Sequence, residues 1–132
     1  MAILLDTSVI IEAERQHLLP NDFLTALPEP AALAAITVAE LLTGVERASP
    51  PSQRLRRESF IEAIISRTTI LPYDLAAARV HAHLSAQLVA QGQQVGTHDV
   101  QIAATAITYG YSVLTHNLRD FQRIPGVVVI QA

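Results

Sequence analysis

Four of the 12 acidic residues in this 132-residue chain lie at predicted junctions between strands and helices: Asp6, Glu40, Asp99 and Asp120. The carboxyl ends of parallel strands meet along one edge of a sheet, and ligands bind in the crevice beyond that edge. Neighbouring carboxylates raise one another's pKa, so a fold tolerates such a cluster when a cation compensates it. Ligand sets made only of oxygen suit Mg²⁺ or Mn²⁺, which activate water for phosphoryl displacement. The four positions therefore predict a divalent-metal phosphodiesterase or nuclease.

Helix capping offers another interpretation of the first two acids. Asp6 follows the apolar segment 3–5 and precedes Thr7 and Ser8, either of which suits the N-cap of the next helix. Thr37 and Glu40 have the spacing of a capping box, which by itself accounts for a glutamate at this position. A metal site and a pair of helix starts thus remain alternatives for Asp6 and Glu40.

The other two acids also have structural alternatives. Asp99 is a favourable charge at the start of a predicted helix, although Thr97 can cap the same helix. Asp120 lies in a predicted turn, where pairing with Arg119 or Arg123 is the simplest alternative. No one of these positions is specific alone, and the prediction depends on all of them meeting at one edge.

Further polar residues are predicted at the same edge of the sheet. Hydroxyl and amide groups beside metal-binding carboxylates donate hydrogen bonds that fix their rotamers. The candidates for this task are Thr7, Ser8, Thr115 and Asn117. His98 and His116 flank the acids in sequence and are candidates for contacting a phosphate or moving a proton, with a side chain pointing to solvent as the alternative.

The elements that must position these residues alternate along the chain. Strands are predicted at residues 3–5, 31–36, 68–71, 111–114 and 127–130. Helices are predicted near 8–16, 23–27, 54–66, 75–91 and 100–109, another helix starts with the periodic segment 38–42, and a helical turn is predicted near 117–121. Strands that alternate with helices favour an α/β fold in which helices sandwich a mainly parallel sheet. Residues 1–132 match the usual size of a single domain.

Composition excludes several classes of function. The chain has no cysteine, which excludes disulfides and thiolate sites, and its net charge of -3 argues against nucleic-acid binding through a large basic surface. All nine basic residues are arginine, so lysine-dependent phosphate loops and Schiff-base chemistry are excluded. No apolar segment approaches the roughly 18 residues of a membrane span, and no secretion signal is visible. A cytoplasmic protein without a membrane partner is expected.

Four motifs, in order, resemble those of PIN-domain ribonucleases, specifically the VapC toxins of VapBC toxin–antitoxin systems. They are Leu-Asp-Thr-Ser-Val-Ile at 5–10, Thr-Val-Ala-Glu-Leu-Leu-Thr-Gly at 37–44, Gly-Thr-His-Asp-Val-Gln-Ile-Ala-Ala-Thr-Ala at 96–106, and Leu-Thr-His-Asn-Leu-Arg-Asp-Phe at 114–121. Their order and spacing, and the total length, extend the resemblance over essentially the whole chain.

The resemblance implies a three-layer α/β/α domain with an acidic pocket and an Mg²⁺- or Mn²⁺-dependent endoribonuclease activity. By matched position, Asp6, Glu40, Asp99 and Asp120 become the catalytic acids, with Asp6 and Asp99 as metal ligands. Thr7 and Thr115 match the polar residues that accompany them. Family members often carry arginine where this chain has His116. The family usually forms homodimers, and a cognate VapB-type antitoxin inhibits it.

Other classes of protein compete with this interpretation. A signalling receiver domain also gathers acids around Mg²⁺, but it needs a lysine that this chain lacks. A phosphatase of the D-x-D type is disfavoured because Ser8 occupies the second position after Asp6. A non-catalytic PIN-like interaction protein with an acidic metal pocket stays open. The Phe23 and Phe60 helices carry wide apolar stripes, which leaves a dimer or partner groove possible, whereas Arg54, Arg56 and Arg57 are expected on a solvated face.

Overall fold

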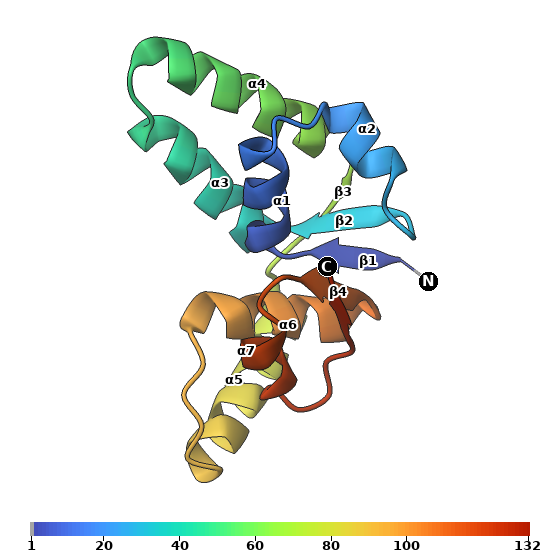
Figure 1. Cartoon of the computed structure of the whole chain (residues 1–132). Helices are drawn as coiled ribbons and strands as arrows, with labels where there is room; N and C mark the ends of the chain where they lie inside the picture. The colour runs from blue at the N-terminus through green and yellow to red at the C-terminus, as the bar shows by residue number, and fades with distance from the viewer. Residues whose placement is uncertain (1) are drawn as a thin grey trace.

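The computed structural model describes residues 2–132 and contains a five-stranded parallel β-sheet (Figure 1). The strands are β1 (Ile3–Leu5), β2 (Ala31–Ala34), β3 (Thr69–Leu71), β4 (Ser112–Thr115) and β5 (Val129–Gln131), in the spatial order β3-β2-β1-β4-β5. The central strand β1 is fully buried, as expected for a continuous apolar segment in a parallel sheet. The predicted strands at residues 3–5, 68–71, 111–114 and 127–130 are confirmed to within two residues.

Seven helices connect and cover the strands. They are α1 (Thr7–Arg15), α2 (Pro20–Thr25), α3 (Ala35–Arg47), α4 (Pro51–Ser66), α5 (Leu75–Ala90), α6 (Thr97–Tyr109) and α7 (Leu118–Gln122). Asp74 caps α5, since its Oδ1 accepts the backbone N–H of Ala77 at 3.0 Å. Gly110 ends α6 in the left-handed conformation, with φ of 76°. None of the helices among residues 2–132 combines the length and apolar character that crossing a membrane requires.

The alternating side chains of the strands divide the core into two layers. Leu4 and Val113 pack on one face of the sheet with residues of α5, α6 and α7. Ile3, Leu5 and Leu114 pack on the other face with residues of α1, α2, α3 and α4. Figure 1 shows the two groups of helices on opposite sides of the strands. The predicted three-layer α/β/α architecture is therefore confirmed.

The order of the strands creates a switch point between β1 and β4. From β1 the chain continues outward through β2 and β3, whereas β4 and β5 lie on the opposite side of β1. Leu5 pairs with Leu114, so the carboxyl ends of the two strands lie next to each other and lead directly to Asp6 and Thr115. A switch point in a parallel sheet is where a ligand crevice forms.

The predicted boundary between the second strand and its helix is wrong. The strand ends at Ala34 rather than Ile36, and α3 begins at Ala35 without a side-chain cap. Thr37 lies inside the helix, fully buried, and its hydroxyl has no hydrogen-bond partner among residues 2–132. Thr37 and Glu40 therefore form no capping box, because alanine favours helix over strand and lets the helix begin earlier.

The predicted apolar stripe of α4 is correct only in its second half. Ile61 and Ile64 are buried, and Phe60 and Ile65 pack partly against the same core. Leu55, which shares the periodicity, is 66% exposed. In Figure 1 the first turns of α4 extend beyond the sheet, where there is no strand to cover them. Sequence periodicity predicted the face of the helix correctly but not where the sheet beneath it ends.

Replacing Leu4 and Leu55 with alanine distinguishes these two environments. Leu4→Ala leaves a cavity in the fully buried centre of the sheet and is expected to lower the free energy of unfolding by about 2–5 kcal/mol. Leu55→Ala is expected to change it by less than about 0.5 kcal/mol, because the side chain is exposed. Urea denaturation of both variants measures the difference. Equal losses in the free energy of unfolding would contradict the placement of Leu4 inside the core and of Leu55 outside it.

Candidate active site

Asp6 is held at the switch point by hydroxyl groups from both sides of the sheet edge. It occupies the N-cap position of α1, and its side chain is only 5% exposed. Its Oδ2 accepts a hydrogen bond from Ser8 Oγ at 2.8 Å and another from Thr115 Oγ1 at 2.8 Å. Because both donors bind the same oxygen, Oδ1 is left without a hydrogen-bond donor from residues 2–132. The carboxylate is thus fixed in orientation with one oxygen available.

The two hydroxyl groups also order the loop that follows β4. Thr115 Oγ1 accepts the backbone N–H of Asn117 at 2.8 Å, and Ser8 Oγ accepts that of His116 at 3.2 Å. The prediction that Thr7 or Ser8 caps α1 is wrong, since the helix begins at Thr7 with Asp6 in the N-cap position. The hydroxyls of residues 7 and 8 are turned instead toward neighbouring carboxylates.

Glu40 reaches the same edge from the second turn of α3. Its Oε1 accepts a hydrogen bond from Thr7 Oγ1 at 3.1 Å, and its Oε2 lies 3.2 Å from His98 Nδ1. The Glu40 side chain is 28% exposed, whereas that of His98 is 60% exposed. Glu40 therefore joins the N-terminal turns of α1 and α6, which are far apart in the sequence.

Asp99 is the carboxylate with the most unfavourable surroundings. It lies half-buried in the first turn of α6, and it has no hydrogen-bond partner among residues 2–132. Burial and the neighbouring charges of Asp6, Asp120 and Glu40 raise its pKa from 3.8 to about 6, while His98 opposes the increase. The alternative that Thr97 or Asp99 caps α6 is wrong, because Gly96 occupies the N-cap and no side chain caps the helix.

Asp120 completes the group from the first turn of α7. Its Oδ2 accepts a hydrogen bond from Asn117 Nδ2 at 2.8 Å, and its Oδ1 lies 4.0 Å from Arg123. The predicted turn and the Arg123 pairing are both present. However, the effect of Asp120 on the pKa of Asp99 shows that the acid also faces the shared site. The other three acids predicted from the sequence therefore lie within electrostatic reach of Asp99.

His98 and His116 have different positions at this edge. The side chain of His98 contacts Glu40, whereas the side chain of His116 is exposed. His116 contributes through its backbone N–H, which binds Ser8. No pattern in the sequence could indicate this contribution, because a backbone N–H is present whatever the side chain.

The donor chemistry of this group fits a hard divalent cation. In residues 2–132, no three His, Asp or Glu side chains converge into a ready metal-binding group. The fit comes instead from two carboxylates. Asp99 is a half-buried charge without a donor, and Asp6 presents one oxygen without a donor. Oxygen ligands of this kind suit Mg²⁺ or Mn²⁺, and a cation relieves the repulsion that raises the pKa of Asp99.

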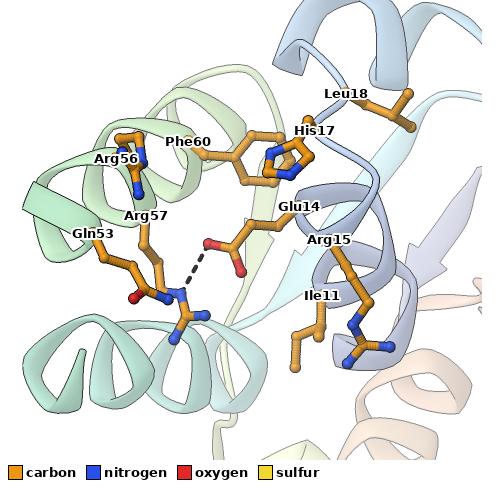
Figure 2. A pocket seen from close by; sticks show the side chains of 9 residues that line it. All are labelled: Ile11, Glu14, Arg15, His17, Leu18, Gln53, Arg56, Arg57 and Phe60. Carbon is orange, nitrogen blue, oxygen red and sulfur yellow. Dashed lines mark hydrogen bonds and ion pairs between the residues drawn. The ribbon is translucent and has the colours of Figure 1, made fainter. Parts of the chain in front are cut away.

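A separate cavity of about 440 Å³ lies between α1 and α4 (Figure 2). Phe60, Leu18 and Ile11 contribute apolar surface to its lining. Arg57 was expected on a solvated face, but it is two-thirds buried and forms an ion pair with Glu14 at 2.9 Å (Figure 2). This contact joins α4 to α1, and nothing in the sequence indicated it because the two residues are 43 positions apart.

Comparisons with known proteins identify the family. A PIN-domain family model matches residues 3–127. Ribonuclease VapC1 of Rickettsia felis is 39% identical over 130 residues, which cover 98% of this chain and 96% of the relative. The tRNA(fMet)-specific endonuclease VapC of Salmonella typhimurium is 39% identical over 95 residues, covering 72% and 70% of the two chains. DNA-bound VapBC from Salmonella typhimurium superposes with a TM-score of 0.85 at 32% identity, covering 99% of this chain and 98% of the other.

The fold and the sequence agree on the class of protein. The chain belongs to the PIN-domain family and, within that family, to the VapC proteins.

Replacing Thr115 with valine tests the hydroxyl that joins Asp6 to the β4 loop. Thr115→Val keeps the shape of the side chain but removes a donor to Asp6 and an acceptor for Asn117, so the free energy of unfolding should fall by about 1–3 kcal/mol. Thr105→Val is the matched control, since Thr105 is equally buried but donates only to the carbonyl of Gln101. Urea denaturation should show the larger loss for Thr115→Val, and equal losses would argue against the network.

Replacing Asp99 with asparagine tests the electrostatic strain in metal-free protein. A folded-state pKa of about 6, above the usual 3.8, means that stability falls as pH rises through this interval and that the whole penalty acts above it. In EDTA at pH 7.5, Asp99→Asn should therefore be more stable than the wild type, and the gain should shrink as pH is lowered toward 4.

The matched control for this measurement is Glu62→Gln, which removes an exposed carboxylate from α4. It should show no comparable pH-dependent gain in urea denaturation. A loss of stability in Asp99→Asn at pH 7.5 would show that the neighbouring acids do not repel Asp99.

Proposed function

We propose that this chain is the toxin of a VapBC-type toxin–antitoxin pair and acts as an Mg²⁺- or Mn²⁺-dependent endoribonuclease. The observation that carries the proposal is the environment of Asp99. This carboxylate is half-buried, has no hydrogen-bond donor and is repelled by the charges of three other acids. Membership of the VapC family supports the same conclusion, since relatives along the full chain are named ribonucleases. The substrate proposed is RNA, and the reaction is hydrolysis of a phosphodiester bond.

Asp6 and Asp99 are the residues proposed to hold the cation. When bound, Mg²⁺ or Mn²⁺ supplies an activated water nucleophile and neutralises charge on the phosphate oxygens. Asp6 is suited to this role because Ser8 and Thr115 fix one of its oxygens and leave the other unengaged. Asp99 is suited to it because its charge is otherwise uncompensated.

The other residues of the site act on protons and on orientation. Glu40 and Asp120 are the two other carboxylates that act on Asp99, and either would assist deprotonation of the attacking water. Asn117 holds Asp120 through a 2.8 Å hydrogen bond. The exposed side chain of His116 is available to a phosphate of the substrate.

The partners proposed are a VapB-type antitoxin and a second copy of the chain. Structures of VapBC complexes from Rickettsia felis and Haemophilus influenzae have TM-scores of 0.86 and 0.82, and each covers nearly all of this chain. These likenesses support a cognate antitoxin as the regulatory partner. The homodimer is proposed because members of this family usually form homodimers.

Cleavage assays with variants of the two proposed metal ligands test this function. The wild type should cut a labelled structured RNA, with initiator tRNA as the first substrate, in Mg²⁺ or Mn²⁺ but not in EDTA. Asp6→Asn and Asp99→Asn should each abolish metal-dependent cleavage, because each replaces a charged oxygen ligand of the proposed cation with a neutral amide. Glu62→Gln should cut at the wild-type rate.

Two outcomes would overturn the proposal. Metal-dependent cutting that persists in both variants would show that these acids do not form the site. No cutting by the wild type on any RNA, together with no binding of Mn²⁺, would favour a non-catalytic PIN-like interaction protein. Circular dichroism of each variant establishes that the fold is intact.

A further inference from the structure

Glu40 contacts residues of two helices that are remote in sequence. Thr7 of α1 donates to Oε1 at 3.1 Å, and His98 of α6 lies 3.2 Å from Oε2. Each of its two carboxylate oxygens therefore has its own partner. Asp6 differs, because both of its donors bind one oxygen. Glu40 is thus contacted on both of its carboxylate oxygens.

Without these donors, the position of Glu40 would be unfavourable. A glutamate side chain has several rotatable bonds, and Glu40 lies close enough to Asp99 to raise the pKa of that residue. Like charges at this range repel, and a partly exposed glutamate is free to turn toward solvent. The contacts with Thr7 and His98 oppose that movement. They keep Glu40 directed toward the acid cluster.

The contact with His98 has a second consequence, for α6. No side chain caps the N-terminus of this helix, since Gly96 occupies the N-cap position. His98 is adjacent to Asp99 in the first turn, so its contact with Glu40 also ties that turn to α3. The same contact therefore affects the positions of two acids.

We propose that His98 is a positioning residue that, together with Thr7, fixes Glu40 relative to Asp99 and so sets the geometry in which the site receives a divalent cation. This inference rests on the proposed metal-dependent function. It assigns His98 a role through Glu40 instead of direct contact with RNA. The role needs only an N–H donor at the Nδ1 position.

Three variants separate this role from the alternatives. His98→Ala removes the donor, whereas His98→Asn retains an N–H at nearly the same place, because the asparagine Nδ2 and the histidine Nδ1 are both bonded to Cγ. His83→Ala is the matched control, since His83 is an exposed histidine on α5. The contact of His98 is largely exposed and contributes little to overall stability, so all three variants should fold.

The first measurement is binding of Mn²⁺ by isothermal titration calorimetry in the absence of RNA. His98→Ala should weaken the affinity by roughly 10–100-fold, the usual effect of removing a group that orients a metal ligand, because the His98 contact holds the turn of α6 that carries the proposed ligand Asp99. His98→Asn should restore most of the affinity, and His83→Ala should match the wild type. In a Glu40→Gln background, His98→Ala should add little further loss, because both changes act through the same carboxylate.

The second measurement separates kcat from KM for RNA cleavage at saturating Mn²⁺. A positioning role predicts a lower kcat with KM for RNA nearly unchanged. A higher KM in His98→Ala with unchanged Mn²⁺ affinity would overturn the inference and make His98 an RNA contact. A His98→Ala variant with unchanged Mn²⁺ affinity and unchanged kinetic constants for RNA cleavage would overturn it as well. If the wild type neither binds Mn²⁺ nor cuts RNA, the proposed function itself fails and this inference fails with it.

Discussion

Repulsion among carboxylates is the constraint on which this site depends. The repulsion is clearest at Asp99, where burial and three acidic neighbours raise the pKa to about 6. The surrounding residues supply hydrogen bonds to the other acids. Ser8 and Thr115 hold Asp6, and Asn117 holds Asp120. These hydrogen bonds hold Asp6 and Asp120 in place close to Asp99 despite the repulsion among the acids.

The parallel sheet makes this concentration of charge possible. Strands β1 and β4 are buried on both faces by the two groups of helices, so their carboxyl ends are fixed relative to each other. The switch in strand order places Asp6 beside Thr115, although they are 109 positions apart in the chain. Rigid placement by buried strands lets short hydroxyl side chains act as donors, because the geometry varies little at such an edge.

Much of this protein was predictable from local sequence. The continuous apolar segments predicted the strands, and their alternation with helical periodicity predicted a parallel sheet covered on both sides. The four acids were identified because they interrupt this pattern at junctions. The Asp74 cap and the Gly110 helix end were also predictable, since each depends on a residue and its immediate neighbours. Such features follow from backbone preferences that act over a few residues.

The remaining features were decided by tertiary structure, because they depend on contacts between remote segments. Thr7 and Ser8 were predicted both as helix caps and as hydrogen-bond donors to the acids, and the fold selects the second role by bringing the carboxylates next to them. Thr37 and Glu40 matched a capping box, but β2 ends early and Glu40 turns toward His98 instead. The sequence by itself determined which residues were available for chemistry. The sheet determined which of them meet, because it alone joins positions that are far apart in the chain.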